Sequence, residues 1–164
     1  MAKVSVLVDT DVFIDYLNNG RFSSVFDSSH FSVYYPIVTR KELLTKLGLR
    51  ETEREAIVAE LSRCRLINLS DAITARYSNL RRQNPSLNKA DALIAATVLV
   101  KRLPLVTRNK RHLRIVEDLP LFGEQFERTR ITGACRAYAE TDGALHPNES
   151  KLLASTLPVE RGPA

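Results

Sequence analysis

The chain has 164 residues, 44% of them hydrophobic and 26% charged, a composition typical of one soluble globular domain with a buried core. Its longest apolar run, residues 92–100, is less than half as long as the ~20 residues that a membrane-spanning helix requires, so we expect no membrane span. The formal net charge is +5, with +6 on residues 1–122 and −1 on residues 123–164, and it is compatible with a polyanionic partner without indicating one by itself.

The start of the chain and its cysteines bear on localisation. Met1 is followed almost directly by the apolar run 4–8, which leaves no room for the apolar region and cleavage site of a signal peptide. Cys64 and Cys135 are too few for a disulfide framework or a zinc site. We therefore expect a cytoplasmic protein with reduced thiols.

Short β-rich runs alternate with helical patterns along residues 1–122. The β-rich runs are apolar and predict five strands, at 4–8, 31–38, 65–69, 105–107 and 119–122. The intervening segments predict helices, at 11–18, 39–47, 51–63, 71–82, 88–102 and 109–116. This alternation predicts an α/β fold of three layers, with helices on both faces of a central, mainly parallel sheet of about five strands.

The pattern fades after residue 122. Glycine and proline recur in the last part of the chain, and large apolar residues become sparse. We therefore expect a domain at 1–122 and a C-terminal extension at 123–164 that is poorly structured or partly helical.

Three carboxylates follow predicted strands or begin predicted helices. Asp9 comes directly after the first strand, Glu42 lies in the first turn of the helix 39–47, and Asp91 lies in the first turn of the helix 88–102. Ligands of open α/β sheets bind at the carboxyl ends of the strands, so these acids could converge there. Converging carboxylates repel one another unless a cation joins them, and oxygen ligands suit Mg²⁺ or Mn²⁺. In a basic protein this pattern favours phosphodiester chemistry.

A structural interpretation of the same acids stays open. Thr39 and Glu42 have the spacing of a capping box, and Asn88 and Asp91 have the same layout with aspartate in third place. An acid in a first helical turn is also favoured by the helix dipole. Asp9 has a simple structural alternative as well, because it could start the helix that follows.

Four segments resemble the motifs of PIN-domain nucleases, in the order and at the spacing of that family. They are VLVDTDVFID at 6–15, IVTRKEL at 37–43, ADALIAATV at 90–98 and LVTRNKRHL at 105–113. The short length is similar to that of the VapC-type toxins of VapBC toxin–antitoxin modules. The resemblance implies a Mg²⁺-dependent endoribonuclease, with Mn²⁺ as a substitute, whose catalytic and metal-binding residues are Asp9, Glu42 and Asp91. It further implies an RNA substrate, a small VapB-like antitoxin as partner, and a homodimer.

The fourth motif departs from the common pattern, because Asn109 and His112 stand where many relatives have acids. Asn109 can offer an oxygen ligand without a charge, so we expect one firmly held metal ion and a weak or absent second one. We expect His112 to be a surface residue of its helix. The nearby side chains of Arg108, Lys110 and Arg111 are candidates for contacts with RNA phosphates.

Two further acids and a threonine lie close to these motifs. Asp11 could hold a metal-bound water or cap the short helix. Asp15, one turn later, is expected to face solvent, with a supporting role behind the metal ligands as the alternative. Thr107 ends its strand and could hydrogen-bond a water on the metal.

Two other functions compete with a nuclease. The segment 9–13, DTDVF, is close to the opening of haloacid-dehalogenase-like phosphatases, although Phe13 departs from that pattern. A PIN-like module that binds RNA or a partner with weak catalysis would also account for the neutral Asn109.

Overall fold

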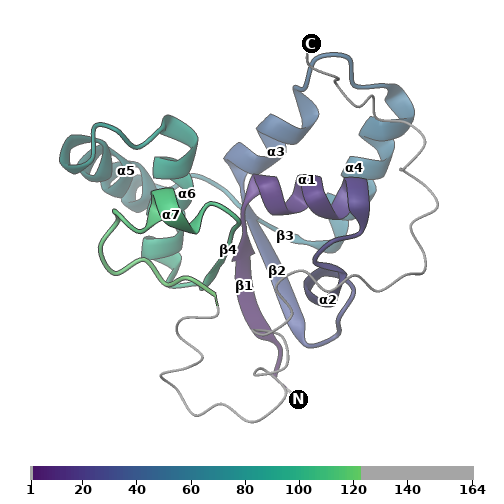
Figure 1. Ribbon diagram of the computed structural model, residues 1–164, viewed down its shortest axis with the longest axis horizontal. Coiled ribbons are helices and arrows are strands. Elements are labelled where there is room, and N and C mark those ends of the chain that lie inside the picture. Colours follow the sequence, from purple (N-terminus) through teal and green to yellow (C-terminus); the bar gives the residue numbers. More distant parts are fainter. Residues whose placement is uncertain (1, 123–164) are drawn as a thin grey trace, which may run out of the picture.

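The computed structural model describes residues 2–122. Its four strands are β1 (Val4–Val8), β2 (Phe31–Pro36), β3 (Arg65–Ile67) and β4 (Leu105–Val106). Its helices are α1 (Thr10–Asn19), α2 (Ser23–Phe26), α3 (Ile37–Leu44), α4 (Glu51–Arg63), α5 (Asp71–Gln83), α6 (Lys89–Lys101) and α7 (Lys110–Leu113) (Figure 1). The expected extension at 123–164 lies outside the described residues, and with it the predicted boundary.

The four strands form one parallel sheet in the order β3-β2-β1-β4. This confirms the predicted α/β class, with one strand fewer than the five expected. The segment predicted as a fifth strand pairs with β4 only through an isolated parallel bridge between Leu121 and Leu105. Pro120 has no backbone N–H to donate, and Asp118 has a left-handed backbone with φ of 57°, so the segment does not extend into a regular strand.

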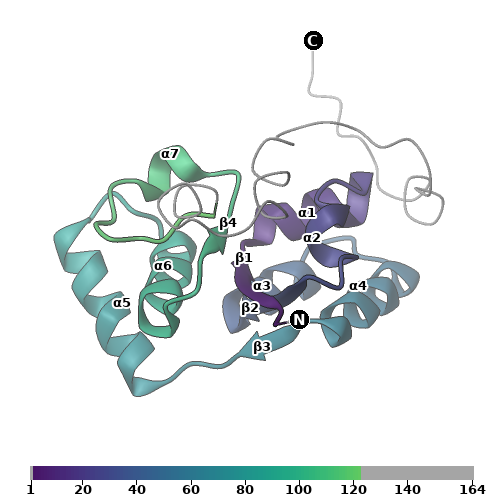
Figure 2. The ribbon, with the colours of Figure 1, turned by 90° about the horizontal axis from the view of Figure 1, so that it is seen from below.

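Helices cover both faces of the sheet (Figure 2). Alternate residues of β1 point to opposite sides, so Leu7 packs into one buried cluster while Val6 and Val8 pack into the other. The cluster around Leu7 includes α5 and α6, and the other includes α1, α3 and α4. The predicted three-layer arrangement is therefore present. None of the helices within residues 2–122 is long and apolar enough to cross a membrane.

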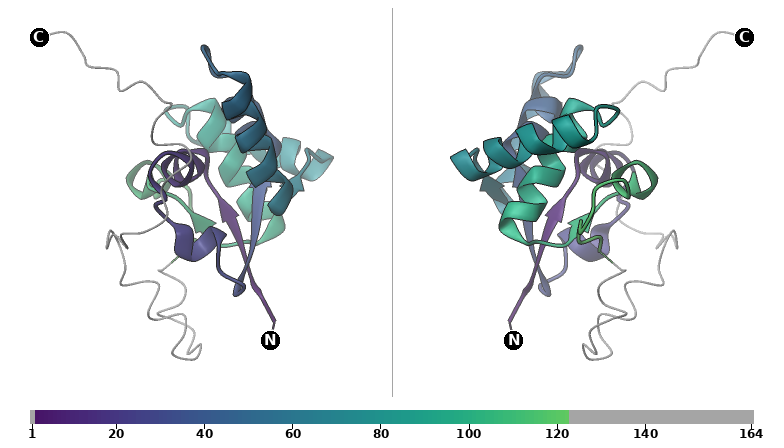
Figure 3. Two further views of the ribbon diagram at one scale, coloured as in Figure 1. Left: turned by 90° about the vertical axis from the view of Figure 1, so that its right-hand side faces the viewer. Right: turned by 90° about the vertical axis from the view of Figure 1, so that its left-hand side faces the viewer.

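The strand order creates a topological switch point at the carboxyl ends of β1 and β4. From β1 the chain adds β2 and then β3 on one side, and it later returns to place β4 on the other side of β1. The connections after β1 and β4 therefore diverge, and such a switch point is where open parallel sheets bind ligands. β1 rises from the N-terminus toward this edge and leads directly into α1 (Figure 3).

The predicted start of α3 was wrong by two residues. We expected the second strand to continue to Val38 and the helix to begin at Thr39, whereas the strand ends at Pro36 and the helix begins at Ile37. Pro36 occupies the N-cap position with extended backbone angles, a conformation that its ring favours before a helix. This shift moves Glu42 out of the first helical turn.

Candidate functional site

Asp9 lies at the switch point between β1 and β4. It is the N-cap of α1, where one carboxylate oxygen accepts a hydrogen bond of 2.7 Å from the backbone N–H of Thr10. The other oxygen accepts a hydrogen bond of 2.8 Å from the Thr107 hydroxyl, which follows β4. Only 4% of Asp9 is exposed. Both carboxylate oxygens are thus oriented by the two segments that leave the sheet at this edge.

Glu42 is joined to the same region through Thr10. The Thr10 hydroxyl donates a hydrogen bond of 2.6 Å to Glu42 Oε2 and lies 2.9 Å from the hydroxyl of the fully buried Thr39. The capping-box interpretation of Thr39 and Glu42 was wrong, because the N-cap of α3 is Pro36. The sequence analysis did not predict that Thr10 links Asp9 to Glu42. The position of Thr10 between Asp9 and Asp11 in the first motif could have indicated such a role.

Asp91 belongs to the capped start of α6 and also contacts another candidate metal-binding residue. Asn88 is the N-cap of α6, and its amide oxygen accepts a hydrogen bond from the Asp91 backbone N–H at 2.8 Å. The Asn88 amide nitrogen donates to Asp91 Oδ2 at 2.7 Å. Asn109, from the loop after β4, also donates to Asp91 Oδ2, at 3.3 Å. Asp91 therefore stabilises the start of α6 and lies against the loop that contacts Asp9.

The loop between β4 and α7 connects the two aspartates. The Thr107 hydroxyl accepts a hydrogen bond of 2.9 Å from the Asn109 backbone N–H while it donates to Asp9. Asn109 in turn donates to Asp91. One hydrogen-bonded network thus contains all four residues predicted to bind the metal ion, namely Asp9, Glu42, Asp91 and Asn109.

Burial disfavours the ionised forms of Asp9, Asp11 and Asp91. Burial is the main cause that raises the pKa of Asp9 from 3.8 to about 7, and the negative charges of Asp11 and Asp91 raise it further. Burial likewise raises the pKa of Asp11 and that of Asp91, and Glu42 adds to the effect on Asp91. A positive charge on His112 acts on Asp91 in the opposite direction. A bound cation would relieve these unfavourable interactions.

Asp11 and Asp15 lie on the side of α1 that faces the loop after β4. Asp11 is not the cap of α1, since Asp9 occupies that position, and its buried Oδ1 atom has no hydrogen-bond partner among the described residues. The expectation that Asp15 faces solvent was wrong. Asp15 is only 7% exposed and pairs with Arg108 at 2.9 Å and with Arg21 at 3.5 Å, because a buried carboxylate requires a cationic partner.

The donor set fits a divalent cation that retains several water ligands. Within residues 2–122, no three His, Cys, Asp or Glu side chains are close enough together to hold a metal ion by themselves. Mg²⁺ commonly binds one or two carboxylates and completes its shell with water, so Asp9 and Asp91 with the amide oxygen of Asn109 form a suitable set. The unpartnered Asp11 Oδ1 atom and the raised pKa of Asp9 both favour a positive charge at this place.

The three predicted RNA-binding residues have different environments. The Arg108 guanidinium is half exposed and forms the ion pair with Asp15. Lys110 is half-buried and Arg111 is exposed in α7, the short helix that follows Asn109. Lys110 and Arg111 therefore remain candidates for phosphate contacts, whereas Arg108 already has a partner in the fold.

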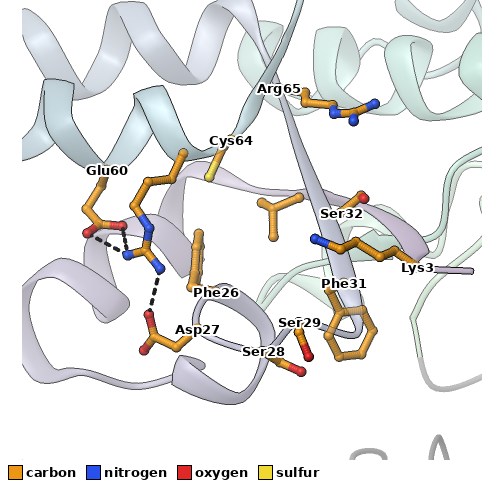
Figure 4. Close-up of a pocket in the computed structure, with 12 residues that line it drawn as sticks. Lys3, Phe26, Asp27, Ser28, Ser29, Phe31, Ser32, Glu60, Cys64 and Arg65 are labelled. Atoms are coloured by element: carbon orange, nitrogen blue, oxygen red, sulfur yellow. Dashed lines mark hydrogen bonds and ion pairs between the residues drawn. The ribbon is translucent and has the colours of Figure 1, made fainter. Parts of the chain in front are cut away.

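A cavity of about 450 Å³ lies at the starts of the strands, at the other end of the sheet from Asp9 (Figure 4). Its lining includes Lys3 before β1, Phe31 at the start of β2 and Arg65 at the start of β3. The acids that line it, Asp27 and Glu60, both pair with Arg63. Since its carboxylates are already neutralised, this cavity lacks the unfavourable negative charge found around Asp9.

Asn109→Asp is expected to have two opposite effects. A carboxylate beside Asp91 should bind Mg²⁺ severalfold more tightly, whereas the metal-free protein should lose on the order of 1 kcal/mol of stability through repulsion. Calorimetric Mg²⁺ titration and metal-free melting curves measure the two effects. Asn109→Ala is the matched control, because it removes the same hydrogen bond without adding charge and should not tighten Mg²⁺ binding. If Asn109→Asp changes neither quantity, Asn109 does not face the metal.

Comparisons with known proteins agree with this fold. "Ribonuclease VapC1" of Methanocaldococcus jannaschii is 26% identical over 121 residues, which cover 71% of this chain and 84% of that protein. A toxin–antitoxin complex from Klebsiella pneumoniae contains a chain with a TM-score of 0.58 and 25% identity, which covers 68% of this chain and 92% of its own. VapBC-1 from nontypeable Haemophilus influenzae gives a TM-score of 0.60 at 21% identity and covers 72% of this chain and 96% of its own.

The family itself is established by a family model. The model described as "PIN domain" matches residues 6–118, which contain all four motifs. The match covers more than half of the chain, and it confirms the resemblance that the four motifs indicated. The chain therefore belongs to the PIN domain family.

Proposed function

We propose that this chain is a Mg²⁺-dependent endoribonuclease, the toxin of a type II toxin–antitoxin module. The observation that carries the proposal is the network that gathers Asp9, Glu42 and Asp91 at the switch point of the sheet, with the pKa of Asp9 raised to about 7. Buried aspartates of this kind are costly unless they serve a cation. The similarity to a relative named as a ribonuclease gives independent support.

Each acid has a distinct part in the proposed hydrolysis of an RNA phosphodiester bond. Asp9 and Asp91 would hold Mg²⁺, and the amide oxygen of Asn109 would add a neutral ligand. When bound, the ion neutralises phosphate charge and lowers the pKa of water. Glu42 is exposed and is oriented by Thr10, so its carboxylate can bind the ion or align the attacking water and accept its proton. Thr107 orients the Asp9 carboxylate, which would fix this ligand before an ion binds.

The proposed substrate and partners follow from the surface and from the relatives. Lys110 and Arg111 follow Asn109 in α7, and we expect them to attract RNA phosphates. Solved structures similar in fold include a toxin–antitoxin complex and two VapBC proteins, one of them VapBC2 from Rickettsia felis bound to a DNA fragment from its promoter, so a small VapB-like antitoxin is the proposed inhibitor. A homodimer is proposed as the assembly of the toxin.

Metal-dependent cleavage by the purified chain tests this function. Single-stranded and structured RNAs should be cut with Mg²⁺ or Mn²⁺, and EDTA should stop the reaction because the ion supplies most of the catalysis. Adding excess Mg²⁺ after EDTA should restore cutting, which controls for damage to the protein. Fragment ends mapped by primer extension should lie within the RNA. Cutting that continues in EDTA would identify a contaminating, metal-independent ribonuclease and would remove the support for this proposal.

One alternative rests on a specific observation. The neutral Asn109, together with the lack of a group of three close metal-binding side chains within residues 2–122, favours a PIN-like module that binds RNA or a partner with weak catalysis. Mg²⁺ binding without cleavage of any tested RNA would support this alternative. Membership of the PIN domain family removes the reason to consider a haloacid-dehalogenase-like phosphatase.

A further inference from the structure

A partly buried ion pair joins α1 to the loop after β4. The Arg108 guanidinium donates a hydrogen bond of 2.9 Å to Asp15 Oδ1, although the two residues are 93 positions apart in the sequence. The Asp15 side chain is 10% exposed, whereas that of Arg108 is 50% exposed. The pair therefore joins a half-exposed arginine to a nearly buried carboxylate of α1.

A second acid of α1 contacts the same residue. Backbone hydrogen bonding from Arg108 to Asp11, together with the positive charge of Arg108, lowers the pKa of Asp11 against the larger effect of burial. Asp11 and Asp15 are four residues apart and so lie on one face of the helix. This face holds Arg108 at two places, through its backbone and through its side chain.

Arg108 stands between the two loop residues that contact the metal-binding carboxylates. Thr107 precedes it and donates to Asp9, and Asn109 follows it and donates to Asp91. The Asn109 backbone N–H also donates to the Thr107 hydroxyl. A displacement of Arg108 would therefore move both contacts at once.

We propose that Arg108 is a positioning residue, which its ion pair with Asp15 holds in place so that Thr107 orients Asp9 and Asn109 orients Asp91. This inference rests on the proposed function, since it concerns the same metal site. It replaces the expectation that Arg108 contacts RNA phosphates, because the guanidinium is already bound to Asp15. Arg108 and Asp15 touch neither the ion nor the RNA in this arrangement.

Mg²⁺ affinity measured by calorimetry tests the inference without RNA. Arg108→Ala and Asp15→Asn should each weaken Mg²⁺ binding by roughly tenfold to a hundredfold, the usual effect of removing residues that orient metal ligands. The double variant should bind Mg²⁺ as tightly as the single variant with the lower affinity, because both changes break the same interaction. Arg21→Ala is the matched control: it removes the other cation on Asp15 and leaves Arg108 in place, so its effect should stay within about twofold.

A conservative variant separates positioning from general loss of stability. Arg108→Lys keeps a cation near Asp15 and should recover part of the Mg²⁺ affinity that Arg108→Ala loses, since the hydrogen bond involves a single guanidinium nitrogen. Melting curves show whether each variant is folded. If Asp15→Asn does not fold, Arg108→Ala decides alone, because its half-exposed side chain can be shortened without opening the core.

RNA binding in EDTA distinguishes positioning from phosphate contact. Arg111→Ala should reduce the slope of log affinity against log salt by about 1, as expected for a lost phosphate contact, and Arg108→Ala should leave the slope unchanged. A reduced slope for Arg108→Ala would overturn the inference and restore a direct RNA-binding role. Unchanged Mg²⁺ affinity in Arg108→Ala would overturn it as well.

Hydrogen exchange of the metal-free protein separates this inference from the proposed function. The Asn109 N–H, which is bonded to Thr107, should exchange at least about tenfold faster in Arg108→Ala and Asp15→Asn than in the unaltered chain or in Arg21→Ala. If the unaltered chain neither binds Mg²⁺ nor cuts RNA, the proposed function fails while faster exchange still supports the positioning role. Unchanged exchange overturns the inference, whether or not the chain is a nuclease.

Discussion

Asp9→Asn and Asp91→Asn are each expected to reduce RNA cleavage by at least about a hundredfold. Both substitutions remove a negative charge from the proposed Mg²⁺ site and keep a side chain of nearly the same shape. Asparagine is a good helix cap, so Asp9→Asn should preserve the start of α1. Single-turnover cleavage rates at saturating protein, with Mg²⁺ varied, measure the loss.

Asp71→Asn provides the matched control for these variants. Asp71 is an exposed acid in the first turn of α5, so its substitution makes the same chemical change at a comparable helical position away from the site. This variant should cleave at an undiminished rate. Asp9→Asn or Asp91→Asn protein that is folded and cuts RNA as fast as Asp71→Asn would rule out the proposed catalytic site.

The metal-free protein should lose stability as the pH rises from about 4 to about 7. The folded state raises the pKa of Asp9 from 3.8 to about 7, so within this range it retains a proton that the unfolded chain has released. The shift corresponds to on the order of 4 kcal/mol, or roughly 8 to 16 °C in melting temperature for a chain of this size. The raised pKa values of Asp11 and Asp91 act in the same direction.

Saturating Mg²⁺ should recover most of this loss above pH 7, because the ion binds the ionised carboxylates of the folded state alone. Melting curves with EDTA and with Mg²⁺, recorded from pH 5 to pH 8, test both effects. Asp9→Asn should flatten the pH dependence in EDTA and raise the metal-free melting temperature at pH 8, whereas Asp71→Asn should follow the unaltered chain. A melting temperature in EDTA that rises between pH 5 and pH 7 would contradict the unfavourable burial of Asp9.

Much of the fold follows from local sequence signals. The apolar, β-branched run Val4–Val8 forms β1 with the bounds expected, and the long apolar pattern at 88–102 forms α6 within one residue at each end. Asn88 caps α6 as its spacing indicated. These features depend on residues close together in the chain, so their physical causes are visible in the sequence.

The candidate site residues could also be found from the sequence, through the four motifs. Asp9 and Asp91 lie at helix starts, as expected, and Asn109 lies next to Asp91. Their roles in metal binding and catalysis stay predictions. The hydroxyl groups that join these residues were not all predicted, because Thr10 acts on Glu42, which is 32 positions away in the sequence.

The sequence by itself determined the α/β class, the order of the elements and the family, because periodicity, capping and motif spacing are local properties. Only the tertiary structure decided which partners the polar side chains have. Asp15 has the sequence context of an exposed helical residue, yet the return of β4 beside β1 buries it against Arg108. Similarly, the segment before Phe122 has strand-like composition, but only Leu121 pairs with β4. Burial and pairing of this kind depend on segments that meet only after the chain has folded.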